Sequence, residues 1–454
     1  MTQSVPWARL TNIFDPWSPL VPGQIDDLFI QRPCSPLARL RSELSRDKLP
    51  THILLPSQPA NGKSTELVRL ARDLGGDGFL VVRLDLQQNV DASRTNPVEV
   101  LFLMGLAVYK TADAIYGDSP DRRPDKAPAQ ALVDALNTIV RQQSQTRKPL
   151  DLTQEIEELV AFTATGLAGV VAGPMGAALA GGAMRGAGRV ARRISISGAT
   201  AETVRRIETE PSIWDMASAL NQVISDVEAK AEKNLVILVD GLDRIDNPDL
   251  TQLIFADQRQ FLDSLTCRVV YTAPAPVAFA LDFEGTRKRF NLVEFPNVKL
   301  FERRSKGGRQ TRDEQGYETM RAIADARFNF LNLNRPQIIP DAILNQLIYH
   351  SGGLLKDFIV LVRKAAIKAQ IDGSDQVTLQ TAQDATHELR RERSRPLTER
   401  EWAVLDKVAR TNQRVAGELC DRLLYSSVVL NYINADDWYD VHAILWDVER
   451  ELVE

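Results

Sequence analysis

The stretch of residues 52–74, HILLPSQPANGKSTELVRLARDL, constrains the fold more than any other part of the sequence. Its apolar run at 53–55 predicts a buried strand, and leucines at helical spacing after position 65 predict a helix. Between them lies a loop that ends in Gly62-Lys63-Ser64. A strand, such a loop and a helix, in this order, form a phosphate-binding loop. A chance match at a helix start is the alternative, and the flanking strand and helix disfavour it.

The residues of this loop have distinct expected roles. Backbone N–H groups at the helix N-terminus hold phosphate oxygens. Lys63 reaches the β- and γ-phosphates, and the Ser64 hydroxyl coordinates Mg²⁺. Ser57 stands where the motif usually has its first glycine, and a serine is tolerated if this position avoids a positive φ. The expected nucleotide ligands in the loop are Ser57, Asn61, Gly62, Lys63, Ser64 and Thr65.

A second segment, residues 235–246 (LVILVDGLDRID), predicts a fully buried strand that ends in Asp240. A carboxylate at the C-terminal end of such a strand lies at the edge where parallel sheets bind ligands. We expect Asp240 to hold Mg²⁺ and Asp243, one turn later, to orient the attacking water. The alternative is a buried strand followed by a solvated acidic turn, which the upstream loop disfavours.

Three further strands complete the expected sheet. Residues 268–272 (RVVYT) end in Thr272, whose hydroxyl could sense the γ-phosphate or simply cap the strand end. Residues 79–86 (FLVVRLDL) and 291–295 also predict strands. Together with the two strands above, they predict an α/β fold in which helices cover both faces of a five-stranded, mainly parallel sheet.

Composition agrees with a folded cytoplasmic protein of about two or three domains. The 454 residues are 44% hydrophobic and 25% charged, and the net charge is −5. These values argue against a disordered chain and against a generally basic surface for nucleic acid.

The three cysteines are far apart and form no CxxC pair, so we expect neither a disulfide framework nor a zinc site. We also expect no signal peptide, because a basic region followed by an apolar one is missing at the start.

Together these segments resemble the AAA+/STAND branch of P-loop ATPases, which includes NACHT and origin-recognition proteins. Residues 29–40 resemble the domain-entry motif F-x-x-R-x-x-x-L-x-x-L with one extra residue, and the run GKSTEL is similar to that of a group of bacterial ATPases of this branch. DGLD at 240–243 resembles the STAND form of the Walker B motif. Residues 351–357 resemble the SGG-x-x-R entry of a lid helix, with Lys356 as the sensor-2 residue. The resemblance spans about residues 14–390.

The resemblance implies ATP and Mg²⁺ as ligands and ATP hydrolysis as the activity. Gly241 stands where most AAA+ unfoldases have a catalytic glutamate, so we expect slow hydrolysis. Lys356 keeps a positive charge but loses the bidentate contact of an arginine. An arginine finger acts in trans in this fold, and Arg287 and Arg289 stand where one is expected, although a solvated basic turn is an equal alternative. A finger implies a homo-oligomer. The expected catalytic residues are Lys63, Asp240, Asp243 and Thr272.

We expect four parts along the chain. They are an N-terminal segment (1–32), the P-loop ATPase core (33–300), a helical lid (301–390) and a winged-helix-like domain (396–454). A charged linker is expected at 387–395, before a helix with Thr398 as its N-cap. From Leu397 onward the chain has 12 acidic and 6 basic residues. Such a charge repels phosphate and favours protein docking over DNA binding.

The core carries an insertion at about 112–212, which contains the uncharged, Gly/Ala-rich segment 159–184. Its 26 residues are long enough for one transmembrane helix. A single crossing would separate Lys63 from Asp240, and Pro174 would break the helix. A re-entrant hairpin, a conditionally released membrane-active segment and a hairpin covered by protein remain as alternatives. KAP ATPases are similar in placing membrane helices between the two motifs.

The sequence leaves several functions open. The first is an ATP-binding and ATP-hydrolysing switch that oligomerises and signals through an effector or sensor protein. The resemblance to bacterial STAND ATPases implies antiphage defence as the process. The second is a DNA-loading or transposition-helper AAA+ ATPase. The acidic charge of the winged-helix-like domain argues against this function. The third is a membrane-active effector ATPase of KAP type, with membrane contact through 159–184. A scaffold that holds ATP without hydrolysis also fits Ser57, Gly241 and Lys356. We expect a cytoplasmic protein, with membrane association only if that segment enters lipid.

Overall fold

The computed structural model describes residues 5–17, 20, 22–46, 50–86, 97–143, 211–303, 311–433 and 437–446. The chain divides into two compact units, which we describe separately. The sheet unit comprises Leu37–Pro56 and Leu67–Glu294, and the helical unit comprises Met1–Pro36, Ser57–Glu66 and Phe295–Glu454. The apolar segment 159–184 lies outside the described residues.

The sheet unit is built on five strands in the order β2-β3-β4-β1-β5. Their bounds are β1 Thr51–Ser57, β2 Leu80–Asp85, β3 Leu235–Asp240, β4 Arg268–Pro274 and β5 Asn291–Leu292. The pairs β1–β5, β2–β3 and β3–β4 are parallel. β1, β3 and β4 are buried along their whole length, as expected of strands covered on both faces. The predicted five-stranded α/β fold is confirmed, although β5 is shorter than the expected 291–295.

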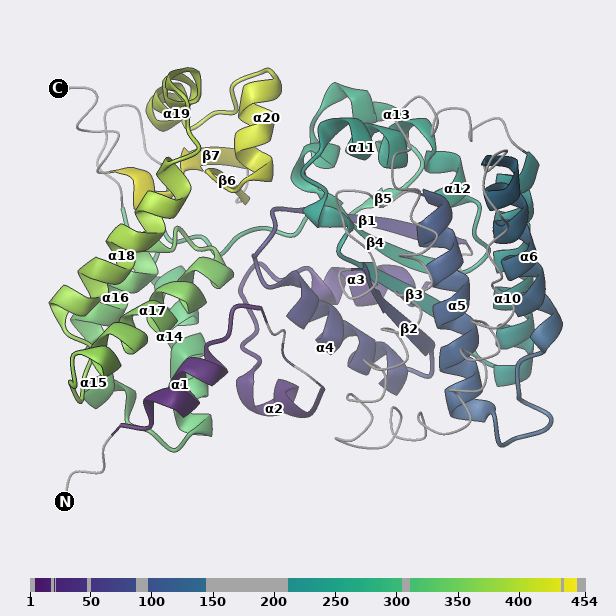
Figure 1. Cartoon of the computed structure of the whole chain (residues 1–454), viewed down its shortest axis with the longest axis horizontal. Helices are drawn as coiled ribbons and strands as arrows, with labels where there is room; N and C mark the ends of the chain where they lie inside the picture. Colours follow the sequence, from purple (N-terminus) through teal and green to yellow (C-terminus); the bar gives the residue numbers. More distant parts are fainter. Residues whose placement is uncertain are drawn as a thin grey trace. The chain divides into compact units, whose positions relative to one another are not determined.

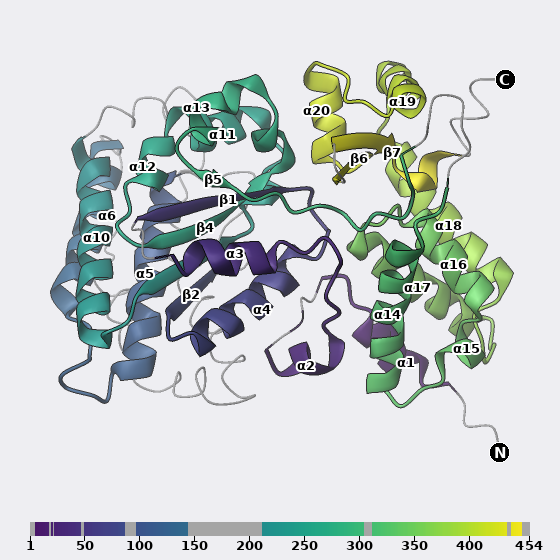
Figure 2. The ribbon, with the colours of Figure 1, turned by 180° about the vertical axis from the view of Figure 1, so that it is seen from behind.

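Helices pack around this sheet. Their bounds are α3 Leu37–Leu44, α4 Lys63–Gly76, α5 Pro97–Tyr116, α6 Lys126–Gln143, α10 Pro211–Ala231, α11 Pro248–Gln252, α12 Arg259–Asp263 and α13 Glu284–Arg287. Shorter turns are η4 Leu242–Arg244, η5 Leu253–Asp257, η6 Ala275–Ala278 and η7 Leu281–Phe283. α5 packs against β2 and β3, and α6 and α10 pack against α5 (Figure 1). Seen from behind, α3 and α4 lie in front of the strands (Figure 2). The apolar side chains of α5 and α10 join those of the strands in one core.

The helical unit contains the N-terminal helices and the expected lid helices. Their bounds are α1 Trp7–Ile13, η1 Pro22–Gln24, α2 Ile25–Leu28, α14 Glu314–Phe330, α15 Arg335–Ile338, α16 Asp341–His350, α17 Leu355–Ile371 and α18 Leu379–Ser394. α17 packs against α1, α16 and α18. Its face with Phe358, Leu361 and Val362 is buried, as the helical spacing of these residues requires.

One expectation for this region is wrong. The charged run at 387–395 is not a linker, because residues 387–394 continue α18. Its charges are matched by α17: Arg393 donates through Nε and Nη2 to the carboxylate of Asp357, each at 2.8 Å, and Glu392 pairs with Lys364 at 3.0 Å. A charged run therefore forms a helix here because its partners lie on the neighbouring helix.

The last residues form a small module of two helices and a hairpin. Its elements are α19 Glu399–Thr411, α20 Glu418–Tyr425, β6 Val429–Ile433, β7 Asp437–Val441 and η8 Ala443–Leu445. β6 and β7 pair antiparallel. α19 begins with a capping box in which the Thr398 hydroxyl accepts from the N–H of Glu401, so the predicted N-cap is confirmed. We call residues 399–446 the C-terminal module, and its assignment as a winged helix stays a prediction.

Within the ranges described above, no helix combines the length and the apolar character that crossing a membrane requires. In the same ranges, no three His, Cys, Asp or Glu side chains gather as a metal-binding group.

Candidate nucleotide-binding site

The phosphate loop, residues 57–63, connects the end of β1 with the first turn of α4. Gly62 has a φ of +88°, and a Cβ there would lie 2.6 Å from Cδ2 of Leu355. Glycine meets both conditions without strain. Ser57 is the last residue of β1 and forms a parallel bridge with Phe295, so its backbone is extended and needs no glycine. The condition under which a serine is tolerated at the first motif position is therefore met.

Lys63 lies at the start of α4 with 3% of its surface exposed. Its ammonium donates to Oγ of Ser57, and to Oδ1 of Asn61 at 3.4 Å. Ser64 and Thr65 follow in the same first turn and are half-buried. This turn is a helix N-terminus, where the first N–H groups have no intrahelical acceptor, and the Thr65 N–H donates to the carbonyl of Gly62 at 3.2 Å. The structure thus brings two of the expected ligands, Ser57 and Asn61, to the ammonium of a third, Lys63. The other three, Gly62, Ser64 and Thr65, lie next to Lys63 in the chain.

A buried arginine from the N-terminal segment supports the loop. Arg32 is 6% exposed, and its Nε lies 2.6 Å from Oε1 of Glu66. Its Nη1 donates to the carbonyls of Asn61 at 3.2 Å and Pro296 at 3.1 Å, and its guanidinium carbon lies 4.3 Å from the centre of the Phe295 ring. A buried charge that is paired and hydrogen-bonded in this way fixes its neighbours. In the sequence, Arg32 belongs to the domain-entry motif and its partner Glu66 to the run GKSTEL. The ion pair between them was not expected.

Lys356, the expected sensor-2 residue, lies next to the loop through its backbone. Its N–H donates to the carbonyl of Ala60 at 2.9 Å, which holds the start of α17 against the loop. Its ammonium lies 3.4 Å from the centre of the Trp17 ring, a cation–π contact. A phosphate contact by Lys356 stays a prediction, and it would draw the ammonium away from this ring.

In the sheet unit, two aspartates close neighbouring strands. Asp240 ends β3 and Asp85 ends β2, and the two are partners in the strand register. Asp240 is 8% exposed. Because the strands are parallel, both carboxylates stand at the edge of the sheet where such folds bind ligands. Asp85 is a candidate that was not expected from the sequence, although the run FLVVRLD ends in an aspartate after an apolar strand.

Thr272 organises the turn that follows β3. It is fully buried in β4, and its hydroxyl oxygen accepts from the N–H groups of Gly241 at 3.0 Å and Leu242 at 3.1 Å. This turn joins Asp240 to Asp243, which is 4% exposed. Of the two expectations for Thr272, the structure shows the capping contact, made to the turn after the neighbouring strand, and a γ-phosphate contact stays a prediction.

The two arginine-finger candidates differ in their surroundings. Arg287 donates through Nη1 to the carbonyls of Val277 at 3.2 Å and Ala280 at 2.6 Å, so it stabilises its own connection. Arg289 pairs with Asp263 at 3.0 Å, and 60% of its side chain is exposed. An exposed ion pair is weak and can exchange partners. Arg289 is therefore the better candidate for a contact with another subunit, and the finger itself stays a prediction.

The phosphate loop between β1 and α4, together with the aspartate that ends β3, decides the fold class. The chain has a P-loop NTPase fold.

No protein-family model matches this chain, and no curated protein matches it either. Among solved structures it is similar to ORC1 of Aeropyrum pernix in complex with DNA, with 12% identity, a TM-score of 0.39 and 98% of each chain covered. It is also similar to ORC2 of Aeropyrum pernix in the ADP form, with 12% identity, a TM-score of 0.40 and 97% of each chain covered. A third is a Walker-type ATPase of Pyrococcus abyssi, with 12% identity and a TM-score of 0.39, covering 96% of this chain and 99% of that one. Because these TM-scores lie below 0.5, the fold class rests on the strand order and the loop of this chain.

Proposed function

We propose that this chain binds ATP with Mg²⁺ and hydrolyses it slowly, as a molecular switch of the AAA+ class. The observation that carries the proposal is the phosphate loop, in which the buried ammonium of Lys63 contacts Ser57 and Asn61. An ammonium group that lies among polar side chains at a helix N-terminus can bind a ligand with several phosphate oxygens. The sheet unit adds Asp240 and Asp243 on one buried turn.

The hydroxyl of Ser64 and the carboxylate of Asp240 are oxygen groups of the kind that Mg²⁺ prefers. Ser64 would supply a hydroxyl, and Asp240 a carboxylate next to that of Asp85. Mg²⁺ usually keeps several waters and binds through one or two carboxylates together with substrate phosphates. Bound there, it would neutralise charge on the phosphate oxygens.

Hydrolysis would be an in-line displacement at the γ-phosphorus. A water oxygen bonds to phosphorus while the bond to the β–γ bridging oxygen breaks, and ADP and phosphate leave. Asp243 would accept a hydrogen bond from the water, and Lys63 would stabilise charge on the transferred group. Gly241 has a φ of +105°, which disfavours a glutamate at this position. The proposed rate is therefore slow.

We also propose that ATP drives self-association through the connection between β4 and β5. Arg289, with its exposed ion pair, would contact the γ-phosphate held by a neighbouring subunit. Leu281 on the same connection is 84% exposed and adds an apolar group for such an interface. Arg289 and Leu281 both belong to the sheet unit, so the support for self-association comes from that unit alone.

The resemblance to STAND proteins supports signalling through an effector or sensor protein, with antiphage defence as the process. The charge from Leu397 onward, 12 acidic against 6 basic residues, supports a protein partner over DNA, because a net negative charge repels phosphate.

Phosphate release and molecular mass, each measured with and without ATP·Mg²⁺, test the proposal. Asp240→Asn should lower phosphate release about a hundredfold. Asp246→Asn, at an exposed position a few residues later, should leave it unchanged. The mass of the parent should grow with ATP·Mg²⁺, and Arg289→Ala should abolish the growth.

Equal phosphate release by the parent and Asp240→Asn would overturn the proposed ATPase. Growth of the parent on duplex DNA without ATP would replace the switch with the DNA-loading function. Growth on liposomes alone would replace it with a membrane-active effector.

A further inference from the structure

Gln58, the second residue of the phosphate loop, is 2% exposed and has an unusual set of partners. Its Nε2 donates to the carbonyls of Leu424 at 3.1 Å and Val429 at 2.7 Å. Its Oε1 accepts from Nδ2 of Asn297 at 2.6 Å and from the N–H of Asn431 at 2.9 Å. A glutamine amide can donate two hydrogen bonds and accept about two, so its capacity is used completely.

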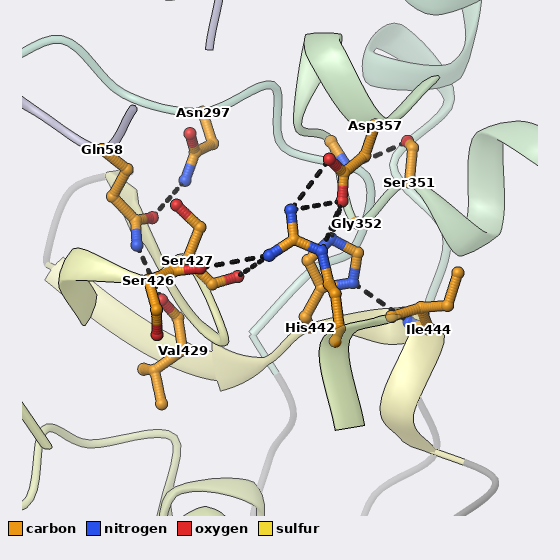
Figure 3. Close-up of polar contacts among 12 residues, drawn as sticks. Gln58, Asn297, Ser351, Gly352, Asp357, Ser426, Ser427, Val429, His442 and Ile444 are labelled. Atoms are coloured by element: carbon orange, nitrogen blue, oxygen red, sulfur yellow. Dashed lines mark hydrogen bonds and ion pairs between the residues drawn. The ribbon is translucent and has the colours of Figure 1, made fainter. Parts of the chain in front are cut away.

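Three of these four partners belong to the C-terminal module, and all of them lie in the helical unit. Leu424 is in α20, and Val429 and Asn431 are in β6. Figure 3 shows the side chains of Gln58 and Asn297 pointing toward each other, with the amide nitrogen of Gln58 directed at Val429. The phosphate loop is thus tied by a side chain to backbone groups more than 360 residues later in the chain.

Asn297 braces this contact. It is 3% exposed, and its Nδ2 donates both to Oε1 of Gln58 and to the carbonyl of Asn431 at 3.0 Å. The network also settles the orientation of the Gln58 amide, since a flipped amide would set its oxygen against the carbonyls of Leu424 and Val429. A buried polar network around one amide favours a single arrangement, because breaking one of its bonds leaves further buried groups without partners.

The position of Gln58 gives this arrangement a consequence for the nucleotide. Gln58 directly follows Ser57, whose hydroxyl accepts from Lys63, so the tied residue and the residue that holds the lysine are neighbours in the chain. A displacement of β6 would move Gln58 and, with it, the backbone N–H groups that are expected to bind phosphate. Holding such groups in place before the ligand arrives lowers the cost of binding.

We propose that Gln58 is a positioning residue of the nucleotide site, through which the C-terminal module holds the phosphate loop in its ATP-binding conformation. The inference rests on the proposed function and adds a coupling to it. Because coupling between two equilibria is reciprocal, ATP must then stabilise the docked C-terminal module to the same degree that the module strengthens ATP binding.

The test combines an ATP titration with hydrogen exchange of the full chain. Gln58→Leu keeps the size of the side chain and removes all four hydrogen bonds. It should weaken ATP·Mg²⁺ binding about tenfold or more. In the parent, saturating ATP·Mg²⁺ should slow amide exchange in residues 424–431, and in Gln58→Leu it should not, even at concentrations that saturate the variant. This loss of linkage is a result that general destabilisation does not produce.

Two further variants guard against misfolding. Gln258→Leu removes a glutamine that is 1% exposed in the sheet unit, and it should keep both the affinity and the exchange response. Asn297→Ala removes only the brace and should give a smaller loss in the same direction. The inference is overturned if Gln58→Leu binds ATP as tightly as the parent or more tightly, or if ATP still slows exchange in 424–431. If the parent itself does not bind ATP, or Lys63→Ala binds it equally well, the proposed function fails instead.

Discussion

Thr272→Val tests the part of the site that depends on backbone geometry. Valine has nearly the shape of threonine, so the change removes the hydroxyl and leaves the packing in place. The hydroxyl oxygen of this fully buried residue accepts from the N–H groups of Gly241 at 3.0 Å and Leu242 at 3.1 Å. A buried N–H left without an acceptor costs about 1–3 kcal/mol. The two N–H groups left without an acceptor therefore predict a loss of about 2–6 kcal/mol in the free energy of unfolding of the sheet unit.

Thr272→Ser is the matched control, because it keeps the acceptor and removes one buried methyl group. Its expected cost is about 1 kcal/mol. Proteolysis in a urea series measures the stability of the three proteins, and hydrogen exchange of residues 235–245 reports on the turn itself. Exchange at Gly241 and Leu242 should speed up strongly in the valine variant and little in the serine variant. Equal stability loss in both variants, with unchanged exchange in the turn, would refute the argument.

Two other changes test buried charges. Arg32→Gln leaves the buried carboxylate of Glu66 without its ion pair and should cost about 3–5 kcal/mol of stability. Arg41→Gln, at an exposed ion pair, should change the stability little, and equal melting temperatures for the two variants would contradict this. Burial holds the pKa of His442 below 6.5 although an aspartate lies beside it, whereas in the unfolded chain this histidine takes up a proton below about pH 6.5. Its contribution to stability is therefore complete above that pH and is lost as the pH falls, so the melting temperature should drop from pH 7 to pH 5 less steeply in His442→Gln than in the parent. His387→Gln, at an exposed position, should keep the slope of the parent.

Much of the fold follows from local pattern. The apolar runs that became β3 and β4 predicted buried strands, because a strand covered on both faces can hold only such residues. The motif around Lys63 placed the phosphate loop and the start of α4, since strand, loop and helix stand next to one another in the chain. Thr398 likewise identified its helix start, because a capping box lies within four residues.

The parts that escaped prediction depend on residues far apart in the sequence. Three of the four partners of Gln58 lie 366 to 373 residues later, and no local pattern indicates such a contact. The pairing of Asp85 with Asp240 follows from the strand order, which the sequence does not state. The charged residues 387–394 were mistaken for a linker because their partners, such as Asp357, lie on α17.

The most direct test of the account is a calorimetric titration of ATP·Mg²⁺ into the full chain, with Lys63→Ala and Lys110→Met as variants. Lys110 is a second buried lysine, on α5, where burial lowers its pKa to about 8. The account predicts that the parent and Lys110→Met bind ATP·Mg²⁺ with equal affinity and that Lys63→Ala loses at least about tenfold. Equal affinity of Lys63→Ala and the parent would contradict the central claim that the phosphate loop at residues 57–63 is the nucleotide site.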